Sequence, residues 1–285
     1  MSIANFIPTV WAEEIEHELK RKYVFVEDCN KKYEGKIKKL GDSVRIKGIA
    51  RPTITTVTRA SARGLNIGKP EQVPESAMTM YINQLSYFNY CVDDIDQAQA
   101  DGDIKGSLQE ETTEGLANAI DKHVAKQVLE APKLFKSPIR VVSGVAQNTD
   151  EMNVLDILDL AIQKIQENDI PDSAKVTVTI SPAFEKILKK AWREIGTNNT
   201  EIMEHGKIGI YSNVVVRRSN NVYRENDVNH IMIRTQRAIA FAEAVTEVKA
   251  YEPEETFQDA VKGFALYDAK VVRPKEIFDI NVICA

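Results

Sequence analysis

The sequence predicts an α+β fold, and three observations carry that prediction. Alternating and β-branched residues fill much of segment 43–92, a long helix with one apolar face follows over 107–130, and helices alternate with strands from residue 153 onward. The chain has 285 residues, 43% of them hydrophobic, so it can bury a substantial core in one large domain or two smaller ones.

The first third of the chain predicts a helix followed by a projecting β-ribbon. Apolar spacing indicates a helix over 11–23, and strands are expected over 43–49, 52–60 and 78–92. In the first of these strands Val44 and Ile46 share a face. Segment 61–76 contains glycine and proline and is typical of a hairpin tip. Because a two-stranded ribbon is only marginally stable alone, we expect it to lie on a neighbouring surface.

Five aspartates fall within 92–106, VDDIDQAQADGDIKG, and raise the question of a calcium loop. No register supplies the ligands of such a loop, since a glycine at its sixth position puts Leu108 where the twelfth-position glutamate belongs. A helix-capping role fits better. Asp93 is expected to cap a short helix, and Ser107 with Glu110 forms a capping box in front of the long helix. We therefore predict a structural role for this acidic stretch.

The second half of the chain predicts an α/β unit followed by strands. Helices are expected over 154–168 and 182–195, the latter with Ser181 as N-cap and Pro182 at its first position, and strands over 175–180 and 214–218. From residue 230 to the end, strands dominate, including IMIRT, AIAFAEAV and FALYDAKVVRP. This alternation is typical of an α/β subdomain.

The sequence contains no recognised catalytic or metal-binding motif. The phosphate loop, the dinucleotide fingerprint, the nucleophile elbow and the zinc-protease motif are all missing, the three cysteines form no C-x-x-C pair, and the four histidines are scattered. We predict no enzyme, no cofactor and no metal, although an enzyme with an unfamiliar site stays open. The chain has no apolar run long enough for a membrane span and no signal-peptide pattern, which predicts synthesis in the cytoplasm.

Charge is unevenly distributed although the net charge is only −5. Basic residues are concentrated between positions 20 and 51, whereas 93–114 is acidic. Such a basic segment can neutralise nucleic-acid phosphates, pair with an acidic face of another copy of the chain, or remain a solvated surface. The sequence leaves these three alternatives open.

Several strings resemble the major capsid proteins of tailed bacteriophages with the Hong Kong 97-like fold. They are FIPTVWAEEIEHELKRKYVF with YEGKIKKLGDSVRI, the join FNYCVDDIDQAQ, the segment HGKIGIYSNVVV, and RAIAFAEAVTEVKAYEPEETFQDAVKGFALYDAKVVRP. The resemblance extends over most of the chain and rests on the order of the elements. It implies an N-terminal arm over 1–32, an extended β-hairpin loop over 33–92, a peripheral domain with a long spine helix over 93–152 and 235–285, and an α/β axial domain over 153–234.

The same resemblance implies a structural function. The chain would self-assemble into the pentamers and hexamers of an icosahedral shell around double-stranded DNA, with loop and arm charges giving specificity between neighbours. Expected partners are further copies of the chain, a separate scaffolding protein, a portal and the packaged DNA, and the expected location is the virion, assembled in the bacterial cytoplasm. The residues expected at subunit interfaces are Trp11, Arg51, Arg59, Arg63 and Lys69.

Two further functions remain as alternatives. A shell protein of an encapsulin-type bacterial nanocompartment would share the fold and enclose enzyme cargo. A basic-armed DNA-binding protein would instead remain a small oligomer with steeply salt-dependent affinity for DNA.

Overall fold

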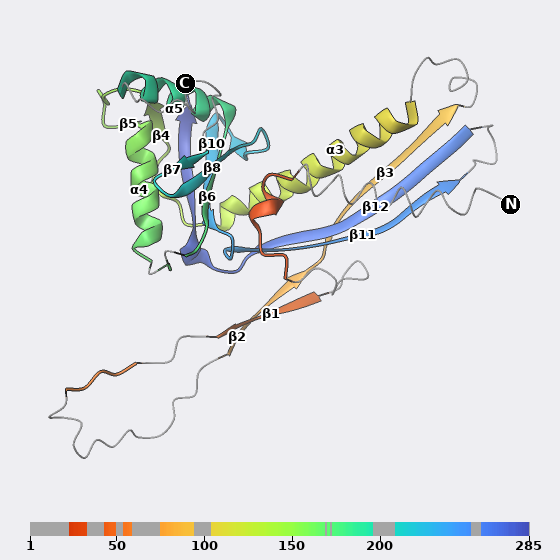
Figure 1. Cartoon of the computed structure of the whole chain (residues 1–285), viewed down its shortest axis with the longest axis horizontal. Coiled ribbons are helices and arrows are strands. Elements are labelled where there is room, and N and C mark those ends of the chain that lie inside the picture. Colours follow the sequence, from red (N-terminus) through yellow and green to blue (C-terminus); the bar gives the residue numbers. More distant parts are fainter. Residues whose placement is uncertain are drawn as a thin grey trace.

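The computed structural model describes residues 23–32, 43–49, 54–58, 75–93, 104–168, 170–171, 173–195, 209–251 and 258–284. These residues form three β-sheets with helices packed on two of them. Figure 1 shows a compact body at one end, a long sheet with a helix along it, and a ribbon that projects away from both. None of the helices in these ranges has the length and apolar character required to cross a membrane.

The compact body is built on an eight-stranded mixed sheet in the order β5-β4-β13-β10-β6-β8-β7, with β9 paired to β10. Its strands are β4 (Ile139–Val142), β5 (Glu151–Asn153), β6 (Val176–Ile180), β7 (Ile210–Tyr211), β8 (Val214–Arg218), β9 (Arg224–Glu225), β10 (Val228–Thr235) and β13 (Ile277–Cys284). Helices α4 (Val154–Gln166) and α5 (Pro182–Ile195) pack against β13 and against each other. The alternating α/β unit that the sequence predicts is therefore present.

Local signals account for the ends of these elements. The Ser181 hydroxyl accepts a hydrogen bond from the Phe184 backbone N–H at 3.3 Å, so the predicted N-cap of α5 is confirmed. Two hairpins, β7–β8 and β9–β10, turn through two-residue loops in which both residues have positive φ, a geometry that favours asparagine and aspartate. The loop residues are Ser212, Asn213, Asn226 and Asp227.

The long sheet has three antiparallel strands in the order β11-β12-β3. They are β11 (Ile239–Tyr251), β12 (Gln258–Val271) and β3 (Gln84–Asp93). Helix α3 (Ile104–Lys126) packs against β12 and β3 and continues into the 3-10 helix η3 (Gln127–Glu130). Leu116, Ile120, Val124 and Val128 are buried, as the apolar spacing of this segment predicts.

The start of α3 differs from the prediction. The helix begins at Ile104, so Ser107 and Glu110 lie inside its first two turns and form no capping box in front of it. The residue before the helix in the sequence is Asp103, which belongs to a type favoured at helix N-termini. Asp93 is the last residue of β3. The short helix that Asp93 was predicted to cap lies outside the described residues, so this prediction stays a prediction.

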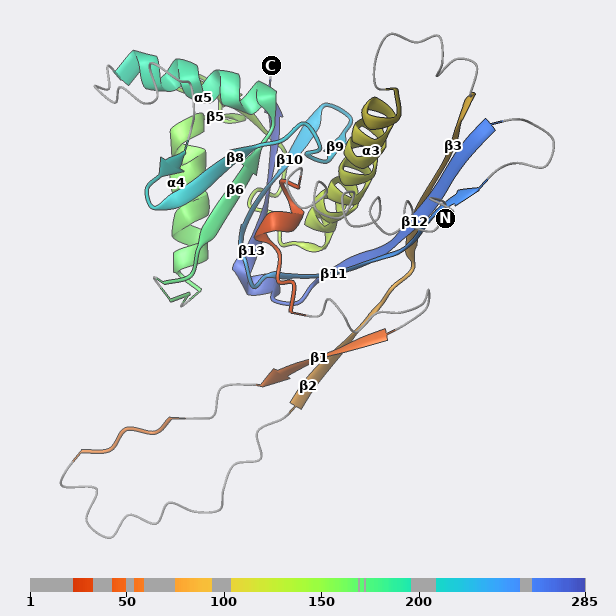
Figure 2. The ribbon, with the colours of Figure 1, turned by 45° about the vertical axis from the view of Figure 1, so that its right-hand side comes forward.

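The ribbon consists of β1 (Ser43–Ile49) paired antiparallel with β2 (Glu75–Tyr81). The first strand matches the predicted range 43–49, and the predicted strand over 78–92 is in fact two strands, β2 and β3, that belong to different sheets. The chain changes sheet at Ile82 and Asn83. Figures 1 and 2 both show the ribbon projecting from the end of the long sheet where β3 begins.

The sheet of the body does not follow the predicted domain boundaries. Strands β4, β5 and β13 lie in segments assigned from the sequence to the peripheral domain, yet they pair into the same sheet as β6, β8 and β10. β13 is central there, with β10 on one side and β4 on the other. Pairing between strands distant in the sequence causes this difference.

Candidate assembly surfaces

The ribbon is anchored at its root by a separate apolar cluster. In this cluster, side chains from β1, β2 and the residue after β2 pack against the first half of β11 and the middle of β12. Its buried members are Val44, Ile46, Met80, Ile82, Ala240, Ala242 and Leu266. The predicted shared face of Val44 and Ile46 is thus confirmed, and the ribbon does rest on a neighbouring surface at its root.

Polar contacts hold the same junction. The Asn83 backbone N–H donates to Asp268 Oδ2 at 3.2 Å, and Asp268 Oδ1 lies 2.9 Å from His123 Nε2 on α3. Lys270 Nζ donates to the Thr79 carbonyl at 2.9 Å. The point where the ribbon leaves the long sheet is therefore held by hydrogen bonds to β12, and through Asp268 it is linked to α3.

The outer part of the ribbon presents apolar side chains to solvent. Residues 54–58, ITTVT, are all exposed and lie in no strand, so the predicted strand over 52–60 is wrong for this part. Ile54 is 88% exposed. A β-strand requires a partner for its backbone groups, and β-branched composition alone does not supply one.

The five residues predicted at subunit interfaces, Trp11, Arg51, Arg59, Arg63 and Lys69, lie outside the described residues. Their contacts stay a prediction. Arg45, which is exposed on β1, shows that the described part of the ribbon also carries positive charge.

A second exposed surface is the outer face of the three-stranded sheet. Phe88 and Tyr90 on β3 pack toward the main core, so the alternation of side chains puts Leu85, Tyr87 and Cys91 on the opposite face. All three are exposed, and Tyr87 is 78% exposed. A face with large apolar side chains of this kind is typical of a protein interaction site.

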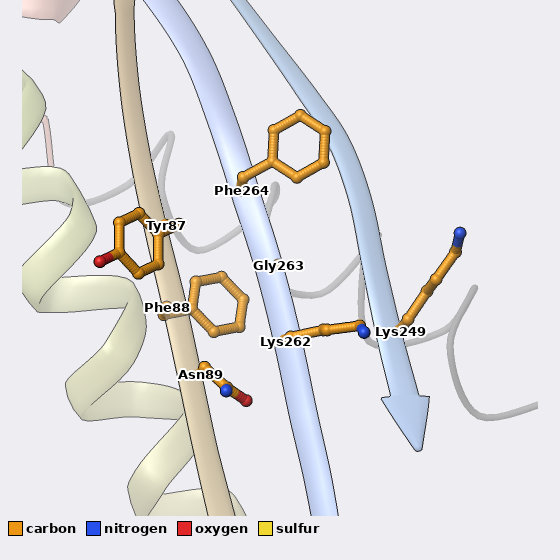
Figure 3. A pocket seen from close by; sticks show the side chains of 7 residues that line it. All are labelled: Tyr87, Phe88, Asn89, Lys249, Lys262, Gly263 and Phe264. Atoms are coloured by element: carbon orange, nitrogen blue, oxygen red, sulfur yellow. The ribbon is translucent and has the colours of Figure 1, made fainter.

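A groove of about 390 Å³ lies on this sheet. Figure 3 shows aromatic rings from β3 and β12 on one side of it and the amino groups of Lys249 and Lys262 on the other. These two lysines are direct cross-strand partners, and Lys262 Nζ lies 4.4 Å from the ring centroid of Tyr251. The groove therefore combines apolar walls with positive charge, which suits a partner segment that has both apolar and acidic groups.

A third feature, residues 23–30, is named here the N-terminal clasp. Asp121 on α3 accepts hydrogen bonds from three successive backbone N–H groups of the clasp, those of Val24 at 2.9 Å and of Phe25 and Val26 at 3.2 Å. Burial raises the pKa of Asp121, an effect that the three N–H groups oppose. The fully buried Arg234 on β10 donates to the Phe25 carbonyl and, at 3.0 Å, to Cys29 Sγ.

Further contacts join the clasp to both sheets. Arg217 on β8 forms ion pairs with Glu27 and Asp28, the latter with 2.8 Å between Arg217 Nε and Asp28 Oδ2. At its end the Asn30 backbone N–H donates to the Ile239 carbonyl of β11 at 2.9 Å. The clasp thus connects α3 and β11 of the long sheet with β8 and β10 of the body.

Two histidines of the described residues, His123 and His230, each lie beside an aspartate. Within the same described part of the chain, no group of three or more His, Cys, Asp and Glu side chains could hold a metal ion. His230 is buried with its Nδ1 2.8 Å from Asp279 Oδ2, and burial raises the pKa of Asp279 while His230 lowers it. Sequence reasoning missed the aspartate partners of His123 and His230 because they lie 145 and 49 residues away along the chain.

Comparison with known proteins gives a structural match without a close sequence relative. No family model and no curated protein sequence matches the chain. A solved chain from Mycobacterium phage Che8 superimposes with a TM-score of 0.68 at 22% identity, covering 90% of each chain. The capsid structure of cyanophage P-SCSP1u gives 0.64 at 12% identity, covering 87% of this chain and 85% of that one.

The mature capsid of bacteriophage PhiM1 also matches, with a TM-score of 0.64 at 16% identity and coverage of 91% of this chain and 87% of that one. The matches span nearly the whole length of both partners. The chain therefore has the Hong Kong 97-like capsid fold that its sequence predicts.

Proposed function

We propose that this protein is the major capsid subunit of a tailed bacteriophage, a structural protein that self-assembles into pentamers and hexamers of an icosahedral shell around double-stranded DNA. The observation that carries the proposal is the β1–β2 ribbon, which projects from the body and exposes apolar side chains beyond its root. A projecting apolar segment is costly for a monomer and is stabilised when a neighbouring copy covers it.

The outer face of the three-stranded sheet is the surface that we propose receives the ribbon of the next copy. It offers exposed Leu85 and Tyr87, while residues 54–58 of the ribbon offer exposed Ile54 and Val57. The ribbon projects away from the body and from the long sheet in Figures 1 and 2, and we propose that this contact forms between copies.

The two sheets suggest a revised division of the chain. The axial domain that we propose is the body, built on the eight-stranded sheet with α4 and α5, and it includes β4, β5 and the C-terminal β13. The peripheral domain is the three-stranded sheet with α3 as the spine helix. The N-terminal clasp then joins the two domains within each copy.

The partners proposed beyond the shell itself are a scaffolding protein, a portal and the packaged DNA. Because the solved structures that the chain resembles are capsid structures, we propose a structural role and no enzymatic one. The mature location is the virion, after assembly in the cytoplasm of the bacterial host.

Electron microscopy of negatively stained protein, with sedimentation velocity on the same sample, tests the proposal. We expect closed shells, tubes or isolated pentamers and hexamers, either from the chain alone or after coexpression with a scaffolding protein. A dimer or tetramer that never grows under either condition would contradict it and would favour the DNA-binding alternative.

A nanocompartment shell is the second candidate, and the comparisons do not favour it over the phage shell. A virus-like particle from Pyrococcus furiosus matches with a TM-score of 0.56 at 12% identity, covering 96% of this chain and 98% of that one. The contents of purified particles discriminate the two candidates. Packaged DNA supports the phage shell, and enclosed enzyme supports the nanocompartment.

A further inference from the structure

Helix α4 of the body presents an acidic surface. Its buried side chains include Val154, Ile157 and Ala161, so its polar residues face outward. Asp156 in the first turn is exposed, and so is Asp150 just before the helix. The surface formed by Asp150, Asp156 and Asp159 is called the acidic α4 surface below; Asp159 also accepts a hydrogen bond from the Tyr211 hydroxyl at 2.9 Å.

Helix α5 presents a basic surface of similar extent. Lys186, Lys190 and Arg193 recur at helical spacing and are exposed, while Phe184 and Leu188 are buried against the sheet. This set of three cations is called the basic α5 surface. Glu185 of the same helix is mostly buried. Its carboxylate oxygens lie 2.8 Å from Lys189 Nζ and 3.4 Å from a guanidinium nitrogen of Arg218.

The two surfaces face different directions. Figures 1 and 2 show α4 and α5 crossing at a steep angle at the outer end of the body, away from the long sheet. Both helices pack on β13 and on each other, and this packing holds the two helices in one relative orientation. One copy therefore carries an acidic surface and a basic surface on two helices that run in different directions.

We infer that the acidic α4 surface of one copy binds the basic α5 surface of the next copy within each ring of subunits. A ring of identical subunits requires a heterologous contact, in which one patch of each copy meets a different patch of its neighbour. Opposite charge on the two patches favours this head-to-tail pairing and disfavours contacts between two α4 or two α5 surfaces. This inference rests on the proposed function, because it assumes that the chain forms closed rings.

A charge-swap series tests the contact. The basic surface is reversed by Lys186→Glu with Arg193→Glu, and the acidic surface by Asp150→Lys with Asp156→Lys. A third variant carries all four changes. The matched control is Lys122→Glu with Lys126→Glu on α3, two exposed lysines of which the second also lies in the last turn of its helix. Circular dichroism melting checks that every variant folds.

The measured quantity is the protein concentration at which half of the chain is in rings or shells, determined by sedimentation velocity at low salt. We expect each reversal to raise this concentration by about tenfold or more, since two attractive pairs become repulsive in every subunit contact. The four-change variant should return toward the wild-type value, and the control should stay near it. High salt should reduce the differences.

Reversals that leave the concentration unchanged would overturn the contact and leave the proposed function intact. Failure of the four-change variant to recover would also overturn it, and DNA binding by α5 would predict that pattern. If the wild-type chain itself formed no rings or shells, the proposed function would fail and this contact would fail with it.

Discussion

The N-terminal clasp supports a quantitative prediction about Asp121. In the native protein Asp121 Oδ1 accepts hydrogen bonds from the Phe25 and Val26 backbone N–H groups, and Oδ2 accepts one from Val24. In Asp121→Asn one oxygen is replaced by an amide NH2, which is a donor and faces another donor. The change also removes the negative charge near the buried guanidinium of Arg234.

The expected loss follows from these contacts. A hydrogen bond to a charged group contributes about 1.5–3 kcal/mol, and a buried donor left without a partner costs about 1–3 kcal/mol. One bond is lost and two are weakened, so Asp121→Asn should lower the free energy of unfolding by about 2–4 kcal/mol. Asp121→Ala removes all three acceptor contacts and should cost more.

Urea unfolding of the unassembled chain, followed by circular dichroism, measures the loss. The control is Glu111→Gln, an exposed position on the same helix, for which we expect a change within about 0.5 kcal/mol. The reasoning would be refuted if Asp121→Asn matched that control. Such a result would mean that the clasp contributes little to the stability of the fold.

Three further predictions concern other parts of the described structure. The exposed Cys91 should react quickly with a thiol reagent. Cys29 should react only on unfolding, because burial shields its thiol and raises the pKa of that thiol. Equal reaction rates for the two thiols would contradict the packing of the clasp. The hydrogen bond from Arg217 lowers the pKa of Glu27 in the folded protein. The ionised Glu27 therefore stabilises the fold at pH values above its unfolded pKa, and this stabilisation is lost as the pH falls through its folded pKa. Glu27→Gln should make the free energy of unfolding fall less steeply at acidic pH, and an unchanged dependence on pH would exclude this contribution. Met80→Ala should destabilise the ribbon root by about 2–5 kcal/mol. Backbone amides of β1 and β2 should then exchange hydrogen faster than in the wild type, while those of α4 serve as the unaffected reference. Equal protection of β1 and β2 in the variant and the wild type would count against the root cluster.

Elements with strong local signals were predicted well: the bounds of β1 and α5 are correct, and α4 ends at Gln166 where the prediction ended at residue 168. Strand β1 and helices α4 and α5 follow directly from alternation, from apolar spacing and from the Ser181 cap, because each of these signals acts within a few residues. The same reasoning failed where the outcome depends on a distant partner. Segment 54–58 has strand-forming composition but no strand, and 78–92 alternates continuously although the chain changes sheet in its middle.

The candidate surfaces were only partly predictable for the same reason. The ribbon was expected from its composition, but the groove combines side chains from β3, β11 and β12, which lie far apart in the sequence. Likewise, Asp121 and Arg234 have no sequence feature that marks them as partners of residues 23–30. Only folding brings the two side chains to the backbone that they bind.

By itself the sequence determined the α+β class, the projecting ribbon, the long helix, the alternating body and the resemblance that led to the capsid fold. These properties reside in local periodicity and in the order of the elements. The tertiary structure decided the sheet to which each strand belongs, the place of β13 between β10 and β4, the buried polar contacts of the clasp, and the packing of α4 and α5 on β13 and on each other. Each of these depends on pairing between residues distant in the chain, which local hydrophobic and capping preferences do not specify.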